Sequence, residues 1–467
     1  MRLSEERLLT AFGEMERWVF GERTVQFAEA RARRPARRPP SPLDPDHFWG
    51  VGIGLKQRKG IWTEEVCVRV FVSRKLPRDQ VPEEVFVPPE VRGVPTDVVA
   101  VGSIRALPSL PSPRFLTPQQ ATFRLRSLLA LPSLRKWMAH EPSLALLEAD
   151  RRNVLWSIRR FAAPCFRQRH RRLPRPVPCG VSIGHFRITA GTLGYLVCDS
   201  KGRRFILSNN HVLADNNAAK FGDPILQPGP FDGGKNTPSY RIAQLSAFVP
   251  IHFDGRANSV DAAIAETDAD QVQPVLCSIG QVEGIGAFRQ GLLVQKHGRT
   301  TGRTQGLIVG THETIWVDYD GKVARFDRQL SIAGGRTPFS DGGDSGSLIV
   351  DLQRRAIGLL FAGSDTETYA NPIRPVLRAF KVRLFGDEGR GARDREGRKD
   401  EPKNRRHRPK SWNAFAGDEA MASANGRPDE RRPPFGGRRD DRKHRPLVDR
   451  GSQRPCADTS RTAQRTH

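Results

Sequence analysis

Between residues 47 and 385, apolar residues alternate with polar ones or form short runs bounded by glycine, proline, asparagine and aspartate. Residues 204–208 and 348–350 are examples of such runs. Side chains of a strand point to opposite faces in turn, so alternation and short bounded runs are typical of β-strands. The pattern predicts a mainly β protein over this part of the chain.

Residues 1–30 follow a different period. Their apolar positions recur at helical spacing and are separated by charged residues; they are Leu8, Leu9, Phe12, Met15, Trp18 and Val19. This spacing predicts an amphipathic helix. Residues 31–46 are rich in arginine and proline, so the segment 1–46 is interpreted as a helix followed by a linker.

Residues 47–105 contain three predicted strands, at 51–55, 66–72 and 96–101, and are interpreted as a small α/β module with a docking or regulatory role. The first strand begins Val51-Gly52-Ile53-Gly54, which has part of the form of a phosphate-binding loop. It lacks the third glycine and the Lys-Ser/Thr pair that make such a loop specific. We therefore interpret these glycines as structural.

Two further segments flank the predicted β domain. Residues 106–176 hold leucine-rich helical stretches and end in a basic run at 167–175, which predicts a helical insert and a basic linker. The basic run leaves open an electrostatic contact with nucleic acid or a membrane surface, although interleaved aromatic residues are sparse. Residues 386–467 contain few aliphatic residues and are predicted to be a disordered basic tail.

The charge of the protein is unevenly distributed. Its 467 residues carry a net charge of +25, but residues 177–385 carry only +3. The excess therefore lies in the flanking segments. A nucleic-acid partner is not indicated for the central domain, and a peptide or protein partner is favoured there by the chemistry that follows.

Residues 343–347, Gly-Asp-Ser-Gly-Ser, have the form of a serine nucleophile in a tight turn ahead of an apolar run. Gly343 can adopt backbone angles closed to other residues. The amides of Gly343 and Ser345 could then converge on one point and form an oxyanion hole. The competing interpretation is an ordinary surface turn, which this composition also gives.

A serine nucleophile needs a general base and a carboxylate that orients it. His211 follows the predicted strand 204–208, so its imidazole would lie at the rim of a sheet. Asp261 lies in the predicted half-buried strand 258–265, where a buried carboxylate needs a partner. Three nearby carboxylates remain as rivals for this role; they are Asp215, Asp254 and Asp268.

The order His211, Asp261, Ser345 and the phrases around them resemble the chymotrypsin-like serine peptidases over residues 177–385. The resemblance implies a double β-barrel, with His211 as general base, Asp261 as its orienter and Ser345 as nucleophile. The phrase Gly298-Arg299-Thr300-Thr301-Gly302 is also shared with members of this family and is interpreted as a hairpin or bulge opening the second barrel. His297, just before it, is a weaker second candidate for the base.

The sequence also departs from that family. No cysteine follows His211, and no hydrophobic activation sequence precedes Gly180, so Asp344 must be satisfied inside the protein. At the position of the family's pocket floor the chain has Phe339, followed by Ser340 and Asp341, which argues against a pocket selective for lysine and arginine alone. Phe361, Ala362 and Gly363 are expected to form the edge strand that pairs with an extended peptide substrate.

The sequence thus predicts a serine endopeptidase without a metal or organic cofactor. The alternative is a catalytically silent protein of the same fold that binds peptides or partner proteins. The six cysteines form no CxxC pair, which indicates neither a zinc site nor a disulfide framework. No signal peptide or membrane span is visible, so a cytoplasmic protein is expected, and its oligomeric state is left open.

Overall fold

The structure is a computed structural model that describes residues 3–21, 47–106, 169–335 and 337–386. The chain divides into two units, residues 1–413 and 414–467, and all described residues belong to the first. The predicted linker at 31–46, most of the helical insert and the predicted disordered tail lie outside the described residues.

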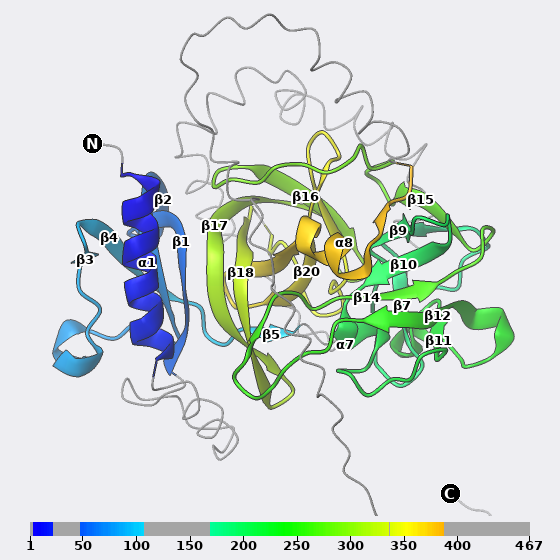
Figure 1. Ribbon diagram of the computed structural model, residues 1–467, viewed down its shortest axis with the longest axis horizontal. Coiled ribbons are helices and arrows are strands. Elements are labelled where there is room, and N and C mark those ends of the chain that lie inside the picture. Colours follow the sequence, from blue (N-terminus) through cyan, green and yellow to red (C-terminus); the bar gives the residue numbers. More distant parts are fainter. Residues whose placement is uncertain (1–2, 22–46, 107–168, 336, 387–467) are drawn as a thin grey trace, which may run out of the picture. The chain divides into compact units, whose positions relative to one another are not determined.

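Six antiparallel strands pair into a closed ring in the later part of the chain (Figure 1). Around the ring their order is β16, β17, β18, β21, β20 and β19, and β19 pairs back onto β16. The strands are β16 (Leu293–Gly298), β17 (Gly302–Tyr319), β18 (Lys322–Gly334), β19 (Leu348–Asp351), β20 (Ala356–Gly363) and β21 (Thr368–Pro372). Closure leaves the ring without a free edge of its own, which is the defining property of a β-barrel.

A second sheet has eight antiparallel strands in the order β22, β9, β10, β14, β12, β11, β7, β8. Seven of them precede the ring in sequence, and β22 follows it. Its strands are β7 (Ser182–His185), β8 (Gly191–Thr192), β9 (Tyr195–Cys198), β10 (Arg204–Ser208), β11 (Pro224–Leu226), β12 (Arg241–Phe248), β14 (Ala263–Glu266) and β22 (Arg383–Leu384). The pairing of β7 with β8 continues to Val181 and Leu193, because the Leu193 amide donates to the Val181 carbonyl at 2.9 Å. The mainly β class predicted from the sequence is confirmed.

Shorter elements connect these sheets. They are β6 (Val177–Cys179), β13 (Ala257–Asn258), β15 (Val272–Leu276), η4 (Pro230–Asp232), η5 (Pro238–Tyr240), α7 (Asn210–Leu213) and α8 (Ile373–Phe380). β6 and β15 form a separate parallel pair, and β13 pairs with β18. No helix among the described residues combines the length and the apolar character needed to span a bilayer.

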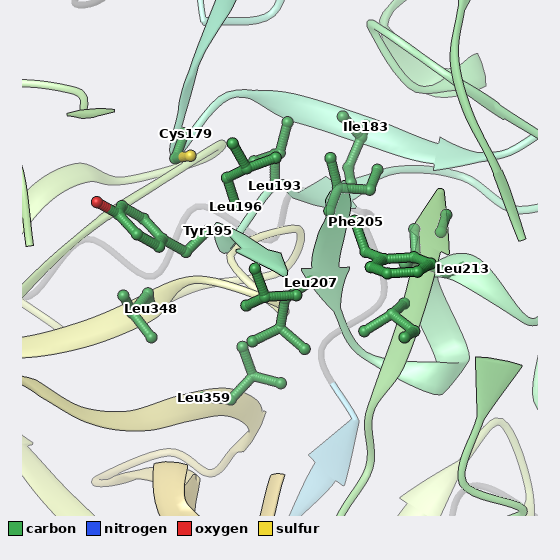
Figure 2. Packing of buried hydrophobic residues seen from close by; sticks show 14 of the residues in the cluster. Cys179, Ile183, Leu193, Tyr195, Leu196, Phe205, Leu207, Leu213, Leu348 and Leu359 are labelled. Carbon is green, nitrogen blue, oxygen red and sulfur yellow. The ribbon is translucent and has the colours of Figure 1, made fainter. Parts of the chain in front are cut away.

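One buried apolar cluster is shared between the ring and the eight-stranded sheet. Leu348 of β19 and Leu359 of β20 belong to the same cluster as Leu207 of β10 and Leu213 of α7, and all four side chains are fully buried (Figure 2). Burial of such side chains is the main favourable term in folding. The cluster therefore fixes the end of β10 against the beginning of β19, which is where the candidate site residues lie.

The N-terminal strands extend the sheet of the ring. They are β1 (Phe48–Arg58), β2 (Ile61–Val72), β3 (Glu90–Val91) and β4 (Val94–Ala100), with η2 (Arg78–Gln80) and η3 (Glu83–Val85) in the connection. β1 pairs with β17 on one side and with β2 on the other, and β2 pairs in parallel with β4. The strands predicted at 51–55, 66–72 and 96–101 are therefore confirmed.

The helix that packs on these strands comes from the segment before them. α1 (Glu5–Phe20) is capped by Ser4, whose side chain accepts a hydrogen bond from the Arg7 amide, and it buries Leu8, Met15 and Val19. This confirms the amphipathic helix predicted for residues 1–30. Its Glu16 also pairs with Arg325 of β18 at 3.0 Å, so α1 is bound to the ring by charge as well as by apolar contact.

A buried charged cluster joins β2 to the ring. The guanidinium of Arg69 is fully buried and pairs with Glu367 and, at 3.4 Å, with Glu313. Burial raises the pKa of Glu313 to about 8 despite the opposing effect of Arg69. Gly52 and Gly310 make room for this carboxyl group, because a Cβ on either would lie 1.4 or 1.7 Å from one of its oxygens. The interpretation of Gly52 as structural agrees with this close approach.

Candidate active site

The turn at residues 343–347 depends on two glycines with left-handed backbone angles. Gly343 has φ +89° and Gly346 has φ +90°, a region that residues with a side chain rarely adopt. Gly346 is also crowded, because a Cβ there would lie 2.0 Å from Ser208 Oγ and 2.4 Å from the Thr192 carbonyl. The turn is thus pressed against the end of β10, and its shape requires glycine at both positions.

Ser345 lies between these glycines, and only 1% of its surface is exposed. Its carbonyl accepts a hydrogen bond from the Thr192 amide at 2.8 Å. Its hydroxyl lies 3.4 Å from the carbonyl oxygen of Phe361 in β20. The hydroxyl is therefore held where the turn, the eight-stranded sheet and β20 meet.

His211 lies in α7, the single helical turn that follows β10. Its Nδ1 lies 2.5 Å from Oδ2 of Asp261, which is fully buried in the segment 259–262 between β13 and β14. The other oxygen, Oδ1, accepts the Asn210 amide at 2.7 Å. The structure thus brings together the histidine and the carboxylate that the sequence singled out, although Asp261 precedes the strand in which we expected it.

The rival carboxylates lie elsewhere. Asp215 pairs with Arg187 at 3.3 Å, Asp254 pairs with Arg256 at 2.8 Å, and Asp268 is exposed. Among these four aspartates, the carboxylate that contacts the His211 ring is that of Asp261.

Tyr319, the last residue of β17, reaches the same carboxylate from the ring side. Its hydroxyl donates to Asp261 Oδ2 at 2.8 Å, and its ring meets the His211 ring edge to face at 5.9 Å. Burial, and then the neighbouring Asp261, raises the pKa of Tyr319 well above its usual value, so the hydroxyl keeps its proton. Oδ2 of Asp261 therefore has two partners, His211 of α7 and Tyr319 of β17.

The approach of His211 to Ser345 can be followed through Gly191. A Cβ on Gly191 would lie 2.5 Å from a methyl carbon of Val212, the residue after His211, and 3.2 Å from the carbonyl oxygen of Ser345. Nε2 of His211 is buried and has no hydrogen-bond partner among the described residues. The structure thus places the two residues in one region without a hydrogen bond between Ser345 Oγ and His211 Nε2. Such bonds are often long or poorly aligned until a substrate binds.

Asp344 is satisfied by an internal cation. Its carboxylate is fully buried, lies 3.2 Å from Lys296 Nζ, and accepts the Thr300 amide at 2.8 Å and the Thr301 hydroxyl at 2.6 Å. Burial works against ionisation, but Lys296 and these hydrogen bonds outweigh it and hold the pKa of Asp344 below its usual value. The structure thus supplies an internal partner for Asp344, as the sequence required.

The phrase at residues 298–302 forms the turn of the β16–β17 hairpin, as expected. The Thr300 and Thr301 amides donate to Asp344 Oδ1, so the hairpin holds the turn at residues 343–347 in place. His297, the weaker candidate for the base, has Nδ1 2.8 Å from Ser278 Oγ, and burial lowers its pKa to about 3. It lacks a carboxylate partner in the described part of the chain and has a structural hydrogen bond instead.

The side chain of Phe339 packs in the apolar cluster inside the ring and is 2% exposed. Its carbonyl accepts the Thr304 hydroxyl at 2.6 Å. The next residue, Ser340, has its hydroxyl 2.7 Å from that of Thr368 in β21. Substrate contacts of Phe339 and Ser340 stay a prediction.

The edge expected at Phe361–Gly363 is not free in this structure. Ala362 and Gly363 pair with β21 on one side and with β5 (Arg105–Ala106) on the other. An open edge is therefore not what the structure shows, because the N-terminal part of the chain supplies the partner strand. The same strand β5 pairs with the end of β17.

Arginines of the basic run at 167–175 also contact the folded domain. Arg169 donates to the carbonyls of Arg299 and Thr300 at 2.8 and 2.9 Å, and Arg175 donates to Gln227 and Gln271. Burial lowers the pKa of both arginines. They are therefore engaged in structural contacts, which differs from the exposed linker that we expected.

Among the described residues, no group of three or more histidine, cysteine, aspartate or glutamate side chains is placed to hold a metal ion. Four cysteines of the described residues are buried and form no disulfide; they are Cys67, Cys179, Cys198 and Cys277.

Sequence reasoning missed Lys296, Tyr319 and β5. A lysine between the apolar strand positions and the Gly298 turn was a signal, since a buried ammonium group needs a partner. Tyr319 and β5 had no comparable signal, because their roles depend on contacts with residues far away in the sequence.

No family model matches the chain, and no curated protein matches it. Among solved structures it is similar to Thermobifida fusca Protease A (17% identity, 44% of this chain, 97% of that chain, TM-score 0.33). It is also similar to a Cellulomonas bogoriensis chymotrypsin (16% identity, 45% and 98%, TM-score 0.31) and to Nocardiopsis protease (16% identity, 44% and 98%, TM-score 0.31). Because these TM-scores are below 0.5, the fold description rests on the strand pairing of this chain.

Proposed function

We propose that this protein is a serine endopeptidase of the chymotrypsin-like type. The observation that carries the proposal is the 2.5 Å contact between His211 Nδ1 and the buried Asp261, at the junction where the glycine-flanked Ser345 lies. A carboxylate on Nδ1 leaves Nε2 as the basic nitrogen, which is the tautomer a serine nucleophile requires. The closed ring and the curved eight-stranded sheet support the two-barrel arrangement of that family.

In the proposed mechanism Ser345 Oγ attacks the scissile carbonyl while His211 Nε2 takes its proton. Asp261 holds the imidazole in the required tautomer and stabilises the imidazolium that forms. His211 then gives the proton to the amine nitrogen of the tetrahedral intermediate, whose C–N bond breaks, so that the amine leaves and the acyl group stays on Ser345 Oγ as an ester. Water, deprotonated by His211, hydrolyses the ester and regenerates Ser345.

The amides of Gly343 and Ser345 are proposed to bind the developing oxyanion. Their orientation depends on Asp344, which lies between them and is tied down by Lys296 and by the turn of the β16–β17 hairpin. An internal lysine does not have to be created by cleavage of the chain. The proposal therefore needs no newly formed amino terminus to shape the oxyanion hole.

The alternative is a protein of this fold that binds peptides without turnover. One observation favours it, namely that Ser345 has only 1% of its surface exposed. This alternative requires that Ser345 is never exposed to solvent. Its hydroxyl would then stay unreactive toward a small electrophile.

A fluorophosphonate probe tests the proposal, because it phosphonylates an activated serine. The unmodified protein should be labelled, and Ser345→Ala and His211→Ala should not. Ser340→Ala is a matched control, since it removes a nearby hydroxyl that has no place in the proton transfer. Labelling that persists in Ser345→Ala would contradict the assignment of the nucleophile. A protein that stays unlabelled even after Ser345 has been made accessible would favour the silent alternative.

A further inference from the structure

Strand β5 (Arg105–Ala106) lies between two strands of the ring (Figure 1). It pairs antiparallel with β20, with Ala106 opposite Ala362 and Arg105 opposite Gly363. On its other side it runs parallel to the end of β17, where the Asp318 amide donates to the Ile104 carbonyl at 2.9 Å. A three-residue segment is thus bonded through its backbone on both sides.

The side chains of this segment alternate as they do in a bound extended peptide. Ile104 is fully buried, Arg105 is exposed, and Ala106 is 6% exposed. Ile104 and Ala106 belong to the apolar cluster that contains Phe361 and Tyr319. The segment thus shares a cluster with Phe361, whose carbonyl lies 3.4 Å from Ser345 Oγ, and with Tyr319, which binds Asp261. It also pairs with their chain neighbours Ala362 and Asp318.

The segment is anchored on its N-terminal side. The Val101 amide donates to the Val72 carbonyl at 2.9 Å, and the Val101 carbonyl accepts the Asp365 amide at 3.2 Å. Gly102, with φ +71°, lets the chain turn against the side chain of Asp365. The chain thus runs from the end of β4 at Ala100, through this anchored turn, to β5 beside β20.

We propose that an extended peptide binds between β17 and β20, and that residues 104–106 of this chain occupy that site as a built-in competitor. The proposal rests on the proposed function, since it places this peptide site beside Ser345. Addition of an extended strand to a sheet edge is a general mode of peptide recognition, in which the backbone gives affinity and alternate side chains give specificity. The two positions that point inward would take apolar or small side chains, and the position of Arg105 would take any.

The test compares the full-length protein with the double variant Ile104→Asp, Ala106→Asp. Two unpaired carboxylates cannot stay in an apolar cluster without a large cost, so this change should expel β5 and leave the site residues untouched. Ile61→Asp is the matched control, since it makes the same chemical change at a side chain that is 41% exposed. Circular dichroism and the thermal midpoint show whether each variant is folded, and Ala106→Asp alone is the milder second variant.

The rate of fluorophosphonate labelling is measured first. The unmodified protein and Ile61→Asp should react slowly, and the double variant at least about tenfold faster, because the competent fraction of molecules rises when β5 leaves. A capped peptide with the sequence of residues 101–106 should slow the double variant again. The same peptide with aspartate in place of its isoleucine should not. Measurable labelling at the same rate in the unmodified protein, in the folded double variant and in folded Ala106→Asp would overturn the proposal.

Binding is measured separately by fluorescence anisotropy of the labelled peptide, in the Ser345→Ala form of each chain. The peptide should bind the double variant, in which β5 has been displaced and which is called the opened chain. It should not bind the chain that retains β5. Binding without any fluorophosphonate labelling would keep the peptide site and contradict the proposed hydrolysis. Labelling of the opened chain without peptide binding or competition would support the reactive serine and contradict the peptide site.

Discussion

The hydroxyl of Tyr319 lies 2.8 Å from Oδ2 of Asp261, the same oxygen that contacts His211. Asp261 belongs to the eight-stranded part of the molecule, and Tyr319 ends a strand of the ring. The carboxylate is thus fixed from both sides, and its position depends on how the two sheets pack together. This makes Tyr319 a positioning residue for the proposed mechanism, although it does not touch the reacting atoms.

We expect Tyr319→Phe to lower kcat by about tenfold and to leave KM nearly unchanged. A hydrogen bond to a charged group contributes about 1.5–3 kcal/mol, and only part of that affects the orientation of the imidazole. Peptide hydrolysis by the opened chain, measured over a range of substrate concentrations, separates the two constants. Tyr240→Phe serves as control, since that ring lies elsewhere, against Arg172. A change in KM alone would contradict a positioning role.

Lys296 is expected to be essential for the shape of the proposed oxyanion hole. Lys296→Met keeps the length of the side chain and leaves Asp344 buried without its cation, which costs about 3–5 kcal/mol. Fluorophosphonate labelling of the opened chain should then fall by at least about a hundredfold. Lys296→Arg, which restores a cation, should recover part of the rate. Equal labelling of the methionine and arginine variants would show that the charge is unimportant.

The buried Glu313 should make stability depend on pH. Its pKa in the folded protein, about 8, exceeds its ordinary value of 4.5, so the folded state binds more protons than the unfolded state between these values. The contribution of this group is therefore fully present below about pH 4.5 and is lost as the pH rises toward 8. We expect Glu313→Gln to flatten the decline of the thermal midpoint between pH 5 and 8. An unchanged decline in that variant would contradict the assignment.

A comparison of alanine substitutions at Gly346 and Gly233 distinguishes the effect of backbone strain from the effect of steric crowding. Both have φ close to +90°, but a Cβ at Gly346 would collide with Ser208 Oγ, whereas at Gly233 there is open space. Gly346→Ala should therefore lower the free energy of unfolding by about 2 kcal/mol more than Gly233→Ala, as for other overpacked sites. Urea unfolding of the two variants measures the difference. Equal losses of unfolding free energy in the two variants would mean that the turn at residues 343–347 shifts to accommodate the added methyl group.

The sequence predicted the features that depend on local periodicity. The helix over 5–20 and strand β10 follow from the spacing of their apolar residues, and the partnership of His211 with Asp261 followed from strand-end context and from the need of a buried carboxylate for a partner. Lys296 and β5 were not predicted, because each acts through a partner that only the folded chain brings near. A two-residue strand such as β5 also carries too little pattern to be recognised.

The anchoring of β5 beside the last N-terminal strand has a consequence for how the site would be controlled. A competitor on the same chain meets its site at an effective concentration of roughly millimolar, so weak contacts are enough to keep it bound. Cutting the chain on the N-terminal side of Val101 would leave this segment tethered only through residues 107–168 on its other side. A long tether lowers the effective concentration, so a single break far along the chain from Ser345 would favour the departure of β5 and expose the peptide site.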